Sequence, residues 1–123
     1  MEFYRCEHRG NIITYIKDSG VKVVCCGEPM KLIVPNSTDA AGEKHVPVIE
    51  VNGKEVVVKI GSVAHPMAAE HHIEWVVLET KEGRQRKALT VDGAPEVKFT
   101  ITDTDEVVNA YAYCNLHGLW SAK

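Results

Sequence analysis

Long apolar runs are missing from this 123-residue sequence, and none approaches the ~18–20 residues that a membrane-spanning helix needs. The first ten residues, MEFYRCEHRG, include Glu2 and no apolar stretch, so they lack the pattern of a secretory signal. Together these absences predict a cytoplasmic protein with no membrane partner. In a reducing compartment, four cysteines are more typical of metal ligands or free thiols than of a disulfide framework.

An excess of positive charge is also missing. The chain has 14 Lys and Arg residues against 17 Asp and Glu residues, which gives a formal net charge of −3. This balance offers no electrostatic footprint for nucleic acid, so no nucleic-acid partner is expected. The densest basic stretch, Arg84, Arg86 and Lys87, is interpreted as a solvated face. An apolar content of 45% is normal for a globular core.

Helical periodicity is absent as well, and no helix longer than one turn is predicted. In the segment 46–61, Asn52-Gly53 lies between two β-branched runs, which is typical of a hairpin with a type I′ turn. Further strands are predicted at 71–80, 84–91, 97–101 and 106–114. Short strands at this spacing predict an all-β fold, with an immunoglobulin-like antiparallel β-sandwich over residues 37–123.

Residues 1–36 are predicted to form a separate, small β domain. The runs 11–16 and 21–26 are separated by KDSG, so they are predicted to pair as a hairpin. A further run at 31–34 leads into a polar loop over 35–44. A segment of this size cannot build an independent hydrophobic core, so it needs a metal or a partner surface.

Alternation along two predicted strands assigns their side chains to faces. In the strand that begins at His71, this residue shares a face with Trp75 and is predicted to point inward, while His72 is predicted to be exposed. In the last strand, Cys114 shares a face with Val108. These assignments place His71 on the inner side of the sandwich and Cys114 on one face of the last strand.

Four histidines and one cysteine stand out as candidate metal ligands. His45, His65 and His71 fall near loops or strand ends, and His117 follows Cys114 by three residues, so that both can grip one ion from a tight turn. Five such ligands are too many for a closed structural zinc site. An imidazole-rich shell with one thiolate suits iron or copper and is capable of redox chemistry.

Several motifs together carry a family resemblance that covers nearly the whole chain. They are EKHVP (43–47), GSVAHPM (61–67), EHHIEW (70–75), DGAPEV (92–97) and CNLHGLW (114–120), in that order. With these motifs the sequence resembles the superoxide reductases, the desulfoferrodoxin and neelaredoxin group of non-haem iron proteins. The fold that this resemblance implies is an immunoglobulin-like sandwich, in agreement with the predicted strands.

The resemblance implies one mononuclear iron with five protein ligands. Four imidazoles are equatorial and the thiolate is axial: His45, His65, His71, His117 and Cys114. The sixth position is open in the ferrous state. By the same resemblance, the active centre performs the one-electron reduction of superoxide to hydrogen peroxide, and an external donor such as rubredoxin reduces it again. Family members form dimers or tetramers, so a homodimer or homotetramer is expected.

Two further residues acquire roles from the resemblance. Glu43 occupies the open position after oxidation, and Lys44 lies over the open site. Superoxide is a small anion, so a lysine raises its local concentration and its association rate. Lys44 is also expected to position a water molecule that delivers the proton.

The N-terminal domain departs from the pattern of the longer family members, which hold a rubredoxin-like iron with CxxC and an adjacent CC pair. Cys6, Cys25 and Cys26 match three of these positions, but the fourth is Arg9, which cannot bind a cation. The sequence favours a desulforedoxin-like domain that keeps its fold without metal. The alternatives are a zinc-like site completed by His8, and thiols that are redox-active or crosslinked.

Two other function classes have partly matching sequence features. A cupredoxin, a copper electron carrier, uses two His, one Cys and usually a weak axial Met after the last His. The residues after His117 read GLWSAK, with no Met, and two histidines are left over. A metal-free or zinc-stabilised sandwich acting as an interaction domain predicts that His→Ala at position 65 or 71 leaves function unchanged.

Overall fold

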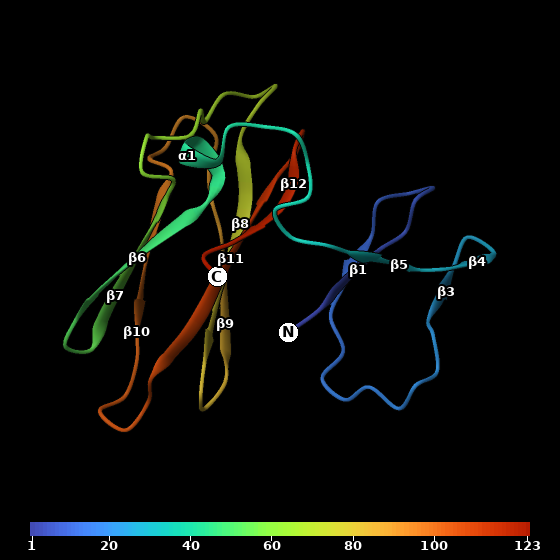
Figure 1. Cartoon of the computed structure of the whole chain (residues 1–123), viewed down its shortest axis with the longest axis horizontal. Coiled ribbons are helices and arrows are strands. Elements are labelled where there is room, and N and C mark those ends of the chain that lie inside the picture. Colours follow the sequence, from blue (N-terminus) through green and yellow to red (C-terminus); the bar gives the residue numbers. More distant parts are fainter. The chain divides into compact units, whose positions relative to one another are not determined.

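The structure is a computed structural model that describes residues 1–123, and the chain divides into two compact units (Figure 1). Unit 1 spans Met1–Val34 and unit 2 spans Pro35–Lys123. The sequence places the boundary between residues 36 and 37. None of the helices has the length and apolar character that crossing a bilayer requires.

Unit 1 contains five short strands. β1 (Phe3–Arg5) lies between β2 (Ile12–Ile13) and β5 (Lys31–Ile33), and β3 (Val24–Cys25) pairs with β4 (Glu28–Pro29). All of these pairs are antiparallel. The three buried apolar residues of this unit are Phe3, Cys6 and Met30, so its core is small.

The predicted hairpin between runs 11–16 and 21–26 is wrong. The strand at Ile12–Ile13 pairs with β1, while Val24–Cys25 pairs with the strand directly after it. The reason lies at Cys26 and Gly27, whose φ angles of 54° and 79° produce the two-residue turn that suits a hairpin. KDSG therefore belongs to the long connection between β2 and β3.

Unit 2 consists of one helical turn and two sheets. The helix is α1 (Gly42–His45), and the strands are β6 (Pro47–Asn52), β7 (Glu55–Ile60), β8 (Ile73–Thr80), β9 (Arg84–Ala88), β10 (Glu96–Thr100), β11 (Val107–Cys114) and β12 (Gly118–Ser121). One sheet has the order β10-β7-β6 and the other β12-β11-β8-β9, with antiparallel neighbours throughout. The predicted antiparallel β-sandwich is confirmed.

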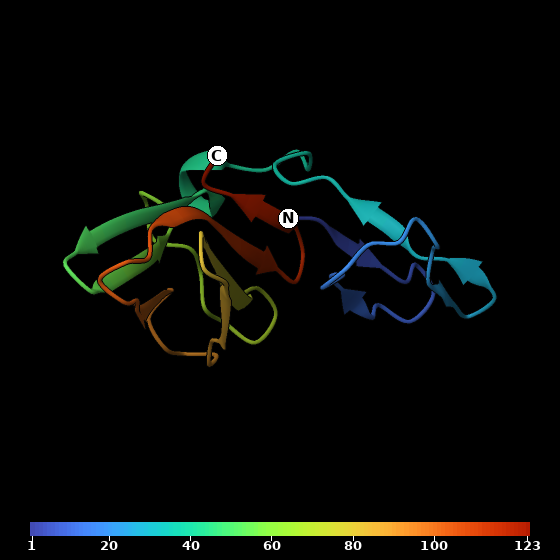
Figure 2. The ribbon, with the colours of Figure 1, turned by 90° about the horizontal axis from the view of Figure 1, so that it is seen from below.

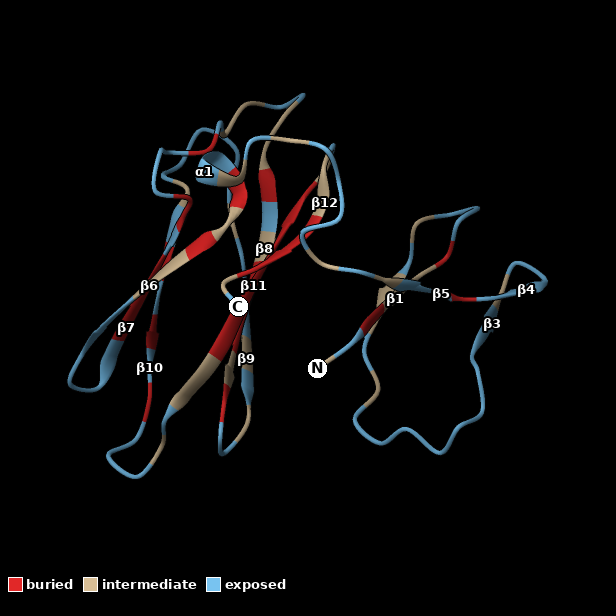
Figure 3. Cartoon of the chain, in the orientation of Figure 1, coloured by how far each residue is buried: buried red, intermediate tan, exposed pale blue.

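The core lies between the two sheets (Figures 1 and 2). Figure 3 shows that burial is concentrated on β7, β8, β11 and β12. The fully buried residues Val56, Val58 and Ile60 of β7 face Val76 and Leu78 of β8, together with the small residues of β11. The end of this core that lies nearest to α1 carries the histidines.

The β6–β7 hairpin is confirmed, although its turn lies one residue later than predicted. Asn52 pairs with Glu55, so Gly53 and Lys54 are the two loop residues. Only Gly53 has a positive φ, 61°, which fits a type II′ turn and not the predicted type I′ turn.

Bulges change which residues share a face on β8 and β11. Cys114 pairs with Ile73 but Tyr113 pairs with Trp75, so Glu74 is an extra residue that reverses the alternation. Ile73 consequently belongs to the core, while Trp75 stacks on Tyr113 with ring centroids 5.5 Å apart. The prediction that His71 shares a face with Trp75 is therefore wrong.

A bulge also changes which residue faces the core at the start of β11. A register shift lies between Val107 and Asn109, and Val107 packs against the core in place of the predicted Val108. His72 is half-buried and not exposed, because its ring Nδ1 lies 3.0 Å from the carbonyl oxygen of Ala68.

Candidate metal centre

His45 is the last residue of α1, and the position of this turn depends on Gly61. A β-carbon at Gly61 would lie 2.5 Å from the carbonyl oxygen of Glu43, so only glycine allows this close approach. The same oxygen accepts a hydrogen bond from the N–H of Val63 at 2.8 Å. His45 is only 3% exposed, and its Nδ1 donates to the carbonyl oxygen of Ala41 at 2.7 Å. Its Nε2 is left to face the interior.

His65 lies in the loop after β7, and its backbone N–H donates to the carbonyl oxygen of Ile60 at 2.9 Å. Its Nδ1 lies 2.6 Å from the carbonyl oxygen of Pro66 and donates to it. The ring is 2% exposed. As in His45, the fixed Nδ1–H leaves Nε2 as the free nitrogen.

His71 and Cys114 approach the same point from the second sheet. The segment before β8 is closed by reciprocal backbone hydrogen bonds between Ala68 and His71, at 2.9 and 3.2 Å. The Nε2 atom of His71 is buried and has no hydrogen-bond partner. Cys114 ends β11 and is fully buried. A buried imidazole nitrogen without a partner indicates that a ligand is needed there.

His117 lies in the turn between β11 and β12. Its Nδ1 is 3.1 Å from Nε2 of His45 and 3.9 Å from Sγ of Cys114. The carbonyl oxygen of His117 accepts a hydrogen bond of 3.1 Å from the indole N–H of Trp120. The Trp120 ring also lies 4.8 Å from the ring of His45. Trp120 thus contacts two histidines of the cluster.

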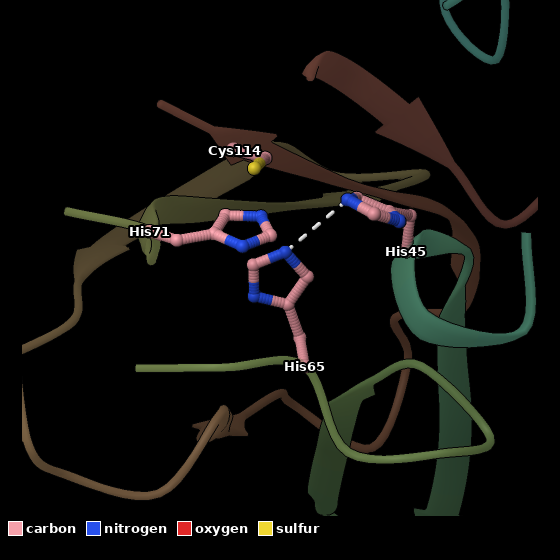
Figure 4. Close-up of side chains that lie close together, drawn as sticks. All are labelled: His45, His65, His71 and Cys114. Atoms are coloured by element: carbon pink, nitrogen blue, oxygen red, sulfur yellow. Dashed lines mark hydrogen bonds between the residues drawn. The ribbon is translucent and has the colours of Figure 1, made fainter. Parts of the chain in front are cut away.

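The donor atoms of this cluster converge on one point (Figure 4). Those of His45, His65, His71 and Cys114 all lie within 4.8 Å of one another. Both His45 and His65 donate through Nδ1, so their Nε2 atoms carry lone pairs, and these atoms face each other at 3.2 Å. Two facing lone pairs repel, whereas a cation between them binds both. The residues present therefore fit a metal ion.

The protonation state of the cluster also favours a metal. Burial lowers the pKa of His45, His65 and His71, and that of His65 falls to about 4. Neighbouring imidazoles strengthen the effect, because a second positive charge in the cluster would be repelled. The three rings are neutral at pH 7, and neutral imidazole is the form that binds a metal.

Comparison with known proteins assigns the family. The desulfoferrodoxin model matches residues 37–123, and the model of the desulfoferrodoxin N-terminal domain matches residues 1–33. The chain belongs to the desulfoferrodoxin family. A desulfoferrodoxin from Nitratidesulfovibrio vulgaris is 48% identical over 122 residues, which cover 99% of this chain and 95% of that protein. A desulfoferrodoxin homolog from Archaeoglobus fulgidus is 45% identical, with coverage of 99% and 96%.

Solved structures of superoxide reductases are also similar to this member of the desulfoferrodoxin family. The superoxide reductase from Treponema pallidum has a TM-score of 0.84 and 48% identity, and the match covers 99% of this chain and 98% of that one. A superoxide reductase (1Fe-SOR) from Giardia intestinalis has a TM-score of 0.55 and 33% identity, with coverage of 64% and 94%.

Glu43 and Lys44, which the sequence predicts to take part in the site of this member of the desulfoferrodoxin family, lie on α1 directly before His45. Both side chains are exposed, while His45 is buried. The one-turn helix therefore carries a buried imidazole on one side and two opposite charges at the surface. Sequence reasoning missed Gly61 and Trp120 as parts of the site, although both stand within the quoted motifs.

A second group of donors lies in unit 1. The sulfur atoms of Cys6, Cys25 and Cys26 lie within 4.8 Å of one another, and all three residues are free thiols. His8 is not part of this group, because its Nε2 lies 3.1 Å from the carboxylate of Glu28. The N–H of Arg9 lowers the pKa of Cys6 to about 7, and hydrogen bonding to Cys6 raises that of Cys26 to about 11.

Proposed function

We propose that this protein is a superoxide reductase, which reduces superoxide by one electron to hydrogen peroxide. One mononuclear iron per chain is the cofactor, with five ligands in unit 2: His45, His65, His71, His117 and Cys114. The observation that carries the proposal is the pair of Nε2 lone pairs that face each other in a buried cluster. Family membership supports the same conclusion.

The protein's own groups prepare this centre. When bound, iron supplies the single electron that superoxide accepts. The carbonyl oxygens of Ala41 and Pro66 fix the tautomer and orientation of His45 and His65. The sulfur of Cys114 is fully buried, so as a thiolate it holds its negative charge away from water. A thiolate ligand of this kind donates electron density to iron.

Lys44 is proposed to attract the anionic substrate and to position a proton-donating water molecule. Its exposed ammonium group is one residue from the buried His45, so its positive charge is close to the cluster but remains hydrated. Glu43 is proposed to cover the open position between turnovers. Both residues are held by the backbone contact of α1 with Gly61.

An external, rubredoxin-like protein is the proposed electron donor, and the proposed location is the cytoplasm. All four cysteines are free, which suits a reducing compartment. Unit 1 is proposed to be a desulforedoxin-like domain that holds no iron of the rubredoxin type, because Arg9 stands in place of the fourth cysteine.

Self-association as a homodimer or homotetramer is also proposed. Four large apolar side chains of unit 1 are more than half exposed: Ile16, Val21, Val24 and Val34. A small unit with little core gains stability by covering such side chains with a second copy. Light scattering of the purified protein measures the number of chains.

The test is a matched pair of variants at neighbouring histidines. The purified protein should contain one iron per chain and consume superoxide without releasing dioxygen. His71→Ala should lose iron and activity, because the Nε2 of His71 faces the cluster. His72→Ala should keep both, because its ring hydrogen-bonds to the carbonyl oxygen of Ala68 and does not belong to the cluster. Equal activity in the two variants, or copper in place of iron, would contradict the proposal.

A further inference from the structure

Unit 1 brings three sulfur atoms together from two separate turns. Cys6 follows β1, and its loop is closed by hydrogen bonds from the N–H of Cys6 to the oxygen of Asn11 and from the N–H of Gly10 to the oxygen of Cys6, both 2.8 Å. Cys25 and Cys26 belong to the β3–β4 hairpin. Cys6 is buried and Cys26 is exposed, so the cluster is open to solvent on one side.

Cys26 has an unusual backbone conformation. Its φ of 54° is in the left-handed region, which Gly and Asn normally occupy in this turn. This conformation places its Sγ 4.0 Å from Sγ of Cys25. Strain that persists in a short turn often indicates a functional constraint. Here the strain keeps a third sulfur beside the other two.

Hydrogen-bond donors surround these sulfur atoms. The backbone N–H of Arg9 donates to Sγ of Cys6 at 3.4 Å, and the side-chain amide of Asn11 donates to Sγ of Cys25 at 3.8 Å. Such donors stabilise negative charge on sulfur. The cluster has no fourth ligand from the chain, since His8 is paired with Glu28 and the Arg9 guanidinium cannot bind a cation.

We propose that Cys6, Cys25 and Cys26 form a three-sulfur site for a soft monovalent cation, Cu⁺. Metal–sulfur bonds of about 2.3 Å in a trigonal plane separate the sulfur atoms by about 4.0 Å. The distance between Cys25 and Cys26 is 4.0 Å, and no sulfur pair exceeds 4.8 Å. Thiolates select Cu⁺, and structural zinc almost always takes four ligands, one more than this cluster supplies.

This site is separate from the proposed reductase centre, so either can fail without the other. The sequence predicts that unit 1 holds no metal. We keep this prediction for iron, but we propose that the unit binds Cu⁺. Binding deprotonates the thiols and ties the loop that carries Cys6 to the β3–β4 hairpin. It therefore supplies the stabilisation that a core of three apolar residues does not.

The test uses the iron-loaded protein with reduced thiols in the absence of oxygen, so that Cys114 is occupied. Cu⁺ is supplied as its complex with a coloured competing chelator. We expect the transfer of one Cu⁺ per chain, a new ultraviolet sulfur-to-copper absorption, and unchanged iron content. Cys26→Asn should weaken Cu⁺ binding at least 100-fold, while His8→Ala should bind as the unchanged protein does.

Asn is the matched replacement because it tolerates the positive φ of residue 26, so the turn is retained and only the sulfur is lost. Iron content and circular dichroism report whether each variant is folded, and Cys6→Ser provides a second removal of sulfur. Failure to take up Cu⁺, uptake that displaces iron, or uptake that Cys26→Asn does not weaken would overturn the proposal. Tight Zn²⁺ binding that requires His8 would overturn it in favour of a four-ligand site.

Discussion

Replacing Gly61 by alanine should damage the metal centre although residue 61 contributes no ligand. The added β-carbon would lie 2.5 Å from the carbonyl oxygen of Glu43 and 2.8 Å from the carbonyl carbon of Lys44. Ordinary contacts begin at 3.4 Å, so the backbone of α1 must retreat by about 0.9 Å. The atoms involved are backbone, so no side-chain rotation relieves the contact.

This displacement of the α1 backbone also moves His45, which is the residue after Lys44. Metal–ligand distances tolerate deviations of about 0.2 Å, so the imidazole can no longer bind without strain. Overpacking of this kind costs about 1–3 kcal/mol. If α1 moves away to relieve it, the loss appears in iron binding as an affinity about 10- to 100-fold lower.

Gly42→Ala is the matched control within the same helical turn. A β-carbon at Gly42 meets only a side-chain methyl of Val46 at 4.0 Å, an ordinary contact. Its iron affinity should stay within about twofold of the unchanged protein. Iron retained after dialysis against a chelator gives the affinity, and the visible spectrum shows whether the ligand set has changed. Equal retention and identical spectra in both alanine variants would refute the reasoning.

Four further predictions concern charge, ligation and unit 1. Lys44→Ala should slow the reaction with superoxide about threefold at low salt, because one charge at roughly 6 Å in water has an effect of this size. Rapid kinetics at two ionic strengths measures the change, and the control variant Lys54→Ala should show none. Cys114→Ser should abolish the sulfur-to-iron absorption band of the oxidised protein and most activity, as spectra and rates would show. In the iron-free protein, His65 has a pKa of about 4 when folded, below the ordinary value of 6.5, so only the unfolded chain takes up a proton as pH falls from 6.5 to 4. Urea titrations should therefore show about 3 kcal/mol of stability lost across that window, and a flat profile would contradict this. Arg9→Cys should create a four-sulfur site that binds a second iron, which metal analysis would count; a single iron per chain would show that the three cysteines are not arranged for a tetrahedral ion.

The sandwich and the convergence of the five donor residues were accessible from the sequence for a local reason. Each donor falls within a short motif beside a turn or a strand end, and hydrophobic alternation locates those ends. The hairpin at Gly53 has its own sequence signature, so its presence is predictable from the sequence although its turn type is not. Features that depend on two or three neighbouring residues were therefore predictable.

Features that depend on a partner strand were not predictable from the sequence. The bulge at Glu74 is set by pairing with β11, and counting by twos along one strand cannot detect an extra residue. The turn at Cys26 lacks the usual Asn-Gly composition, so the sequence predicts the hairpin turn at the KDSG segment instead. The role of Gly61 depends on a backbone contact with α1, which lies earlier in the chain and becomes visible only in three dimensions.

The donor atoms come from both layers of unit 2. His45 and His65 adjoin β6 and β7 of one sheet, while His71 and Cys114 adjoin β8 and β11 of the other. A bound ion consequently fastens the layers together, and each tenfold rise in free iron above the dissociation constant adds about 1.4 kcal/mol to the resistance of this unit to unfolding. If the proposed iron is that ion, we expect the cellular abundance of this protein to fall during iron starvation even when its synthesis is constant, because the iron-free chain unfolds and is degraded more readily.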